Sequence, residues 1–81
     1  MPTDSSTIQQ IFGAVLRDIR MKKGISQQDL ALEAGLDRTY ISLLERGLRQ
    51  PTLTTLICLA DAMGTDAASL VRQTTDNLQR P

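Results

Sequence analysis

Four side chains within residues 38–43 have types and spacing that suit contacts with the edges of DNA bases. If this segment is helical, they lie on the face opposite Ile41 and Leu44; they are Arg38, Thr39, Ser42 and Leu43. Arginine can donate two parallel hydrogen bonds to guanine, hydroxyls donate or accept, and an apolar side chain can contact the thymine methyl group. We therefore predict that these four residues contact bases.

The chain contains few residues that could support catalysis, metal binding or a disulfide. Its 81 residues include no histidine and a single cysteine, Cys58, which excludes a Cys/His zinc site and a disulfide within the chain. The sequence has no glycine-rich phosphate loop and no evident pair of nucleophile and base. We therefore predict that the protein is not an enzyme and has no catalytic residue, no metal site and no cofactor.

The distribution of charge qualifies the DNA interpretation. Nine basic and nine acidic residues give a formal net charge of zero, whereas many DNA-binding domains are basic. Between Arg17 and Pro51, seven basic residues accompany five acidic ones, which leaves a local charge of +2, and residues 52–81 carry −1. We therefore expect tight DNA binding to need a dimer and low to moderate salt.

The spacing of apolar residues predicts five helices and no strand. The predicted helices run from Ile8 to a stop at Gly24, from Ser26 to Gly35, from Arg38 to Arg46, from Thr52 to Gly64, and from Thr65 or Asp66 to just before Pro81.

The chain is long enough for one domain, which we place at residues 8–79 after a flexible, polar tail at residues 1–7. No apolar run approaches the roughly 20 residues of a membrane span, and the N-terminus lacks the features of a signal peptide. We therefore expect a soluble, cytoplasmic protein of the all-α class. With no second domain to sense a ligand, no small-molecule effector is evident.

The second and third predicted helices have the features of a helix-turn-helix. Ser26 and Asp29 form a partial capping box, and Gly35 supplies the left-handed conformation needed at the turn. Asp37 is predicted as the N-cap of the third helix. Ala31 must be small because the third helix crosses close above it. This geometry is that of a DNA-binding unit whose second helix enters the major groove.

The remaining apolar residues divide between an aliphatic core and a second apolar surface. The predicted core consists of Phe12, Leu16, Ile19, Leu30, Ile41, Leu44, Leu56, Leu59, Ala60 and Met63. Helical spacing also places Leu53 on the inward side of the fourth helix. Leu53 is nevertheless not among the residues that the predicted core needs.

Four residues lie wholly or partly outside that core: Leu53, Ile57, Val71 and Leu78. We predict that they form the interface of a two-fold dimer whose half-sites lie about 34 Å apart, with Cys58 near the interface or on exposed surface. Alternatively, Leu53 and Ile57 complete the core, and Val71 and Leu78 anchor the fifth helix to its own chain.

Three further residues near the third helix are candidates for contact with the DNA backbone. Arg46 and Arg49 should reach phosphates at the far end of the helix, although both could be solvated surface charges. Tyr40 could contact a phosphate or pack on the first helix, and the sequence leaves both possibilities open.

A set of residues between about Ile11 and Leu70 carries a resemblance to a known family. The matching residues are Gln27, Leu30, Ala31, Gly35, Ile41, Ser42, Glu45, Arg46, Gly47, Pro51, Leu56, Leu59, Ala60 and Gly64. In these features the chain resembles the phage-repressor, or Xre/Cro, type of helix-turn-helix domain. The pattern RTYIS…ERG is also similar to the small controller proteins of restriction-modification systems.

The resemblance implies a compact five-helix, repressor-like fold and two further residue roles. Gln27 matches the family position at which the start of the second helix meets a phosphate, although a solvated first-turn residue is the alternative. Glu45 matches an acidic residue that pairs with an arginine late in the first helix, here Arg20. The alternative is a water-exposed pair that contributes little.

The function implied by the resemblance is that of a sequence-specific transcriptional regulator that binds a double-stranded DNA operator as a homodimer. A helical protein-interaction module or an antitoxin-like autorepressor, with little direct DNA binding, is the alternative. Within the DNA-binding class the sequence leaves three roles open: restriction-modification controller, antitoxin and phage-type repressor.

Overall fold

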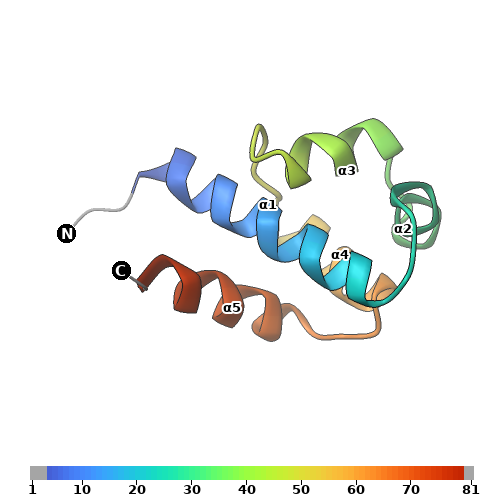
Figure 1. The fold of residues 1–81 in the computed structure, drawn as a ribbon. Coiled ribbons are helices and arrows are strands. Elements are labelled where there is room, and N and C mark those ends of the chain that lie inside the picture. The colour runs from blue at the N-terminus through green and yellow to red at the C-terminus, as the bar shows by residue number, and fades with distance from the viewer. Residues whose placement is uncertain (1–3, 80–81) are drawn as a thin grey trace.

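A computed structural model describes residues 4–79 of the chain and contains no strand within them. Five helices follow one another in this part of the chain (Figure 1): α1 (Ser5–Lys22), α2 (Gln27–Ala34), α3 (Arg38–Glu45), α4 (Leu53–Ala62) and α5 (Ala67–Gln79). The predicted all-α class and the five predicted helices are therefore confirmed.

The start of α1 lies earlier than predicted. The helix begins at Ser5, because the Asp4 carboxylate accepts a hydrogen bond from the Ser6 amide at 3.0 Å and so caps the first turn. Residues 5–7, which we assigned to a tail from their polarity, are therefore helical. Residues 1–3 lie outside the described part of the chain, and the flexibility of the tail stays a prediction.

Helix α1 forms the centre of the fold. It lies between α3 and α5 and packs against both, while α2 contacts α3 and α4 at the far end (Figure 1). The buried core lies where these helices meet and consists of Phe12, Val15, Leu16, Leu30, Ala31, Ile41, Leu44, Leu59, Ala60, Met63 and Leu70. Two predicted core residues, Ile19 and Leu56, are only partly buried and pack against this cluster.

The crossing of α1 over the end of α3 requires a glycine that the apolar pattern did not indicate. A Cβ added to Gly13 would overlap the carbonyl oxygen of Leu44 and lie 2.7 Å from that of Glu45. Gly47 lies on the same contact, since its added Cβ would come within 2.8 Å of the Cα of Gln10. The backbones of α1 and α3 therefore touch directly.

Leu53 is the clearest departure from the predicted helix faces. It is 72% exposed, so its assignment to the inward side of α4 was wrong. The buried residues of α4 are Leu59 and Ala60 in its second half, so helical periodicity continued back to the first residue of the helix overestimates how much of the helix is covered. Within residues 4–79, none of the helices has the length and apolar character needed to cross a membrane.

Candidate nucleic-acid interface

Helices α2 and α3 are joined by a tight turn whose geometry is fixed by local interactions. At the start of α2, Ser26 Oγ accepts from the Asp29 amide at 3.0 Å, and the Asp29 carboxylate accepts from the Ser26 amide at 3.3 Å. Gly35 ends α2 with φ of 70°. Asp37 then caps α3 by accepting from the Thr39 amide at 3.1 Å. The predicted capping box, turn glycine and N-cap are all present, and Ala31 is buried as expected.

Helix α3 presents two chemically different faces. Ile41 and Leu44 are fully buried and fix the helix to the core. Of the four predicted base contacts, Arg38 and Thr39 are exposed, whereas Ser42 and Leu43 are half-buried. The four residues share the side of α3 away from the core, as the spacing predicted, and their contact with bases stays a prediction.

A buried ion pair connects the end of α3 to α1. Arg20 donates to both carboxylate oxygens of Glu45, from Nε to Oε2 at 2.6 Å and from Nη2 to Oε1 at 3.0 Å, and its Nη1 donates to the carbonyl of Ile25 at 2.9 Å. The side chains of Arg20 and Glu45 are only 11% and 3% exposed, so the pair is not a water-exposed one. The hydrogen bonds that Arg20 donates to Glu45 raise the pKa of the Arg20 guanidinium, against the opposing effect of burial.

Gln27 joins the same cluster. It is the first residue of α2, and its Nε2 donates to Glu45 Oε1 at 3.0 Å. No local sequence pattern predicts this hydrogen bond, because it joins residues 18 positions apart and depends on how α2 and α3 pack. The predicted phosphate contact of Gln27 therefore involves a side chain that is already held on one side by Glu45.

Tyr40 and Arg49 lie together at the edge of α3. Tyr40 is half-buried and packs against the core cluster, and the guanidinium carbon of Arg49 lies 5.9 Å from the centroid of its ring. This arrangement favours the packing alternative for Tyr40 and orients Arg49 through a cation–π contact. Arg46 and Arg49 are both exposed, directly after α3, and their contact with the DNA backbone stays a prediction.

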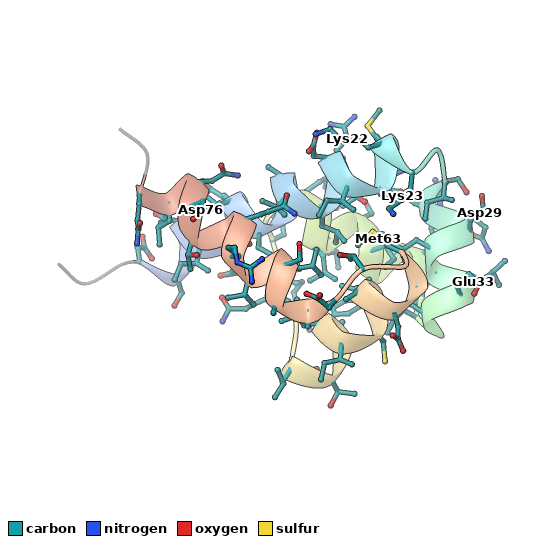
Figure 2. The ribbon with its side chains drawn as sticks, turned by 90° about the horizontal axis from the view of Figure 1, so that it is seen from below. Lys22, Lys23, Asp29, Glu33, Met63 and Asp76 are labelled. Atoms are coloured by element: carbon teal, nitrogen blue, oxygen red, sulfur yellow. The ribbon has the colours of Figure 1, made fainter. Side chains whose placement is uncertain are left out.

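Acidic side chains are arranged so that the outward face of α3 carries none. The acidic residue of α3 itself is Glu45, which is buried and paired with Arg20. The exposed Asp29 and Glu33 belong to α2 and point away from the body of the molecule (Figure 2). The outward face of α3 therefore presents Arg38 and hydroxyl groups, and the exposed carboxylate next to it is that of the N-cap Asp37, which accepts from the Thr39 amide.

Two comparisons place these observations among known proteins. Residues 16–70 match the family described as Helix-turn-helix. The chain is 39% identical over 72 residues to the control protein C.BamHI of Bacillus amyloliquefaciens, a match that covers 88% of this chain and 89% of that protein.

Solved structures of controller proteins are also similar. The restriction-modification controller protein C.AhdI from Aeromonas hydrophila matches with a TM-score of 0.75 and 40% identity, over 76% of this chain and 94% of that one. The controller protein C.Esp1396I, solved as a tetramer in complex with its natural 35 base-pair operator, matches with a TM-score of 0.81 and 29% identity, over 90% of this chain and 96% of that one.

The family match includes all of α2, the turn and α3, together with the Arg20–Glu45 pair and most of the core. It covers more than half of the chain, and the relatives are matched over most of their own length. This chain therefore belongs to the helix-turn-helix family.

Proposed function

We propose that this chain is a sequence-specific DNA-binding transcriptional regulator that acts as a homodimer on a two-fold operator. The observation that carries the proposal is the outward face of α3, which presents Arg38, Thr39 and Ser42 without a carboxylate. An α-helix fits the major groove of B-DNA, and these side chains are of the types that bind base edges there. In this role α3 reads the sequence.

The groups around α3 support its docking on the DNA backbone. The first turn of α2, with Gln27, would meet a phosphate on one side of the groove. Arg46 and Arg49 would meet phosphates at the other end of α3, with Arg49 held by the ring of Tyr40. The small local charge of +2 leaves little attraction beyond these specific contacts.

The apolar surface of α4 and α5 supports the homodimer. Leu53, Ile57 and Val71 are 72%, 49% and 47% exposed, so the alternative that Leu53 and Ile57 complete the core does not hold. Val71 and Leu78 line a cavity of about 200 Å³ between α1, α4 and α5, together with Phe12 and Leu56. An apolar patch beside an apolar cavity is typical of a protein interface. We infer that this surface takes a second copy of the chain.

The operator test starts from DNA of unknown sequence. The chain would be used to select binders from a pool of randomised duplexes, and the recovered sequences would be titrated in a mobility-shift assay over a salt series. We expect two half-sites related by two-fold symmetry, about one helical turn or roughly 34 Å apart. Recovery of no common sequence, with equal affinity for all duplexes, would favour the protein-interaction module instead.

The oligomeric state is tested separately by sedimentation at micromolar concentration. The proposal predicts a dimer in the absence of DNA or a dimer assembled on each operator. A monomer in solution, together with one chain per operator in the titration, would contradict it.

Among regulatory roles, we favour that of a restriction-modification controller. C.BamHI is a control protein, C.AhdI and C.Esp1396I are restriction-modification controllers, and this chain aligns with them over most of both lengths. The genes beside the one that encodes this chain decide between the roles. A neighbouring endonuclease and methyltransferase would support the controller, whereas a toxin gene or phage genes would support the antitoxin or the phage-type repressor.

A further inference from the structure

We propose that Glu45 is a positioning residue for DNA binding, which orients the Gln27 amide toward a backbone phosphate and is itself neutralised by Arg20. The inference rests on the proposed function, because it assigns a role to a residue that does not face the DNA. According to this proposal, the buried Arg20–Glu45 pair and the predicted phosphate contact of Gln27 act together.

The orientation of the Gln27 amide follows from the chemistry of its partner. A carboxylate accepts hydrogen bonds and cannot donate them, so Gln27 must turn Nε2, and not Oε1, toward Glu45. The structure has this arrangement, with 3.0 Å from Gln27 Nε2 to Glu45 Oε1. One of the two amide hydrogens is used in this bond. A phosphate also only accepts, so the second amide hydrogen is the group of this side chain that can bind it.

The position of Glu45 is in turn fixed by Arg20. The two hydrogen bonds between their side chains hold both carboxylate oxygens, and the third bond of Arg20, to the Ile25 carbonyl, ties the cluster to the segment just before α2. Glu45 Oε1 thus accepts from Arg20 and from Gln27 at once. Movement of the carboxylate would therefore move the first side chain of α2.

The pairing with Arg20 also reduces the repulsion between the Glu45 carboxylate and the phosphates of DNA. A carboxylate near the DNA backbone would repel phosphates, and this effect alone would make any neutral replacement of Glu45 tighten DNA binding. With Arg20 beside it, the carboxylate is compensated and can serve as an acceptor for Gln27 at little cost. The positioning role and simple electrostatics therefore predict opposite signs for the same substitution.

The experiment compares Glu45→Gln with the wild-type chain on the selected operator and on a scrambled duplex, by fluorescence anisotropy. Glu45→Gln keeps the shape of the side chain but puts an amide NH2, which is a donor, at one of the two oxygen positions. That NH2 opposes either Arg20 Nε or both Arg20 Nη2 and Gln27 Nε2, so the three hydrogen bonds to Glu45 cannot all be kept. We expect affinity to fall about 2- to 10-fold on both duplexes, the range for loss of one hydrogen bond. Tighter or unchanged binding by Glu45→Gln would overturn the proposal.

A combined variant separates positioning from a general structural effect. Gln27→Met removes the amide at nearly constant size and should weaken binding to both duplexes without changing the salt dependence, because the lost group is neutral. If Glu45 acts through Gln27, then Glu45→Gln adds little to Gln27→Met. Full additivity of the two effects would contradict the proposal. Arg49→Ala is the matched control, whose effect should add to that of Glu45→Gln.

A second variant covers the case in which Glu45→Gln does not fold, as judged by helical circular dichroism and thermal unfolding. Arg20→Lys keeps the charge but cannot hold both carboxylate oxygens and the Ile25 carbonyl together. We expect a smaller loss of affinity that disappears in the Gln27→Met background. A loss that persists there would overturn the proposal, while failure of the wild-type chain to bind any duplex would instead overturn the proposed function.

Discussion

The α2–α3 unit and the α4–α5 pair use exposed surface in opposite ways. On α3 Ile41 and Leu44 are buried and the exposed positions are Arg38 and Thr39. By contrast, α4 and α5 expose Ile57 and Val71, and Val71 also lines an apolar cavity. Leu32 on α2 is also 71% exposed, but single exposed leucines are common on protein surfaces. The difference indicates two partners of different chemistry: a charged one for α3 and an apolar one for α4 and α5.

The largest expected effect is on stability, at the backbone contact between α1 and α3 around Gly13, which holds α3 in place. Gly13→Ala should destabilise the fold by about 3 kcal/mol, the upper part of the range for overpacking, because the new methyl group meets backbone carbonyls that cannot move aside. This loss should exceed the roughly 1 kcal/mol that alanine gains in a helix interior. Chemical denaturation measures the free energy of unfolding.

The matched control is Gly24→Ala. Gly24 has φ of 73° but nothing within 4 Å of an added Cβ, so it tests backbone strain without a clash, at roughly 1–2 kcal/mol. A Gly13→Ala variant at least as stable as the wild-type chain would mean that α1 and α3 can separate without cost.

The next largest effect is expected on dimerisation, through the exposed apolar residues of α4 and α5. The double substitution Ile57→Glu and Val71→Glu should move the sedimentation equilibrium toward monomer by more than 10-fold, because it buries like charges at the proposed interface. Operator affinity should fall with it, while the helical content stays unchanged. Leu32→Glu is the control, since it alters a more exposed apolar residue on α2, outside the proposed interface. Dissociation by Leu32→Glu alone would place the interface elsewhere.

A smaller effect is expected on operator binding, through the polar side chains of α3. Arg38→Ala should cost roughly 1–3 kcal/mol of binding free energy on the selected operator and relax the preference at one base pair. The check is a repeat of the selection from randomised duplexes with the variant. Equal weakening on operator and scrambled DNA would show that Arg38 binds phosphates only.

The smallest effect is expected on DNA affinity when a single predicted phosphate contact, that of Arg46, is removed. Arg46→Ala should weaken binding to all duplexes alike and lower the slope of log affinity against log salt by about 1, because one phosphate contact is lost. Arg46 is exposed at the end of α3, so the fold should be unaffected. A loss of helical circular dichroism would instead identify Arg46 as a structural residue.

These regions also differ in how far the sequence predicted them. The turn between α2 and α3 was predicted in detail, because Ser26, Asp29 and Gly35 act within three or four residues along the chain. The pairing of Arg20 with Glu45 came from family resemblance and not from spacing. Helical periodicity placed Leu53 on the inward side of α4, which was wrong, whereas its separate prediction as a residue outside the core agrees with its exposure. Periodicity gives the face of a helix but not how much of that face other elements cover.

Gly13 had a signal that could have been used. A glycine within the apolar stripe of a helix lowers helix stability, and its presence therefore suggests a close approach of another backbone. The hydrogen bond between Gln27 and Glu45 had no such signal, since nothing in either local sequence indicates that the two side chains meet.

The sequence by itself determined the helices, most of their ends and the polar side chains of α3, because caps, glycines and apolar periodicity act over a few neighbouring residues. Only the tertiary structure decided that α1 and α3 touch at Gly13, that Gln27 shares the carboxylate of Glu45 with Arg20, and that α4 and α5 leave an apolar surface open. The reason is physical: these features depend on the distance and angle between helices, which are set by the packing of the whole core.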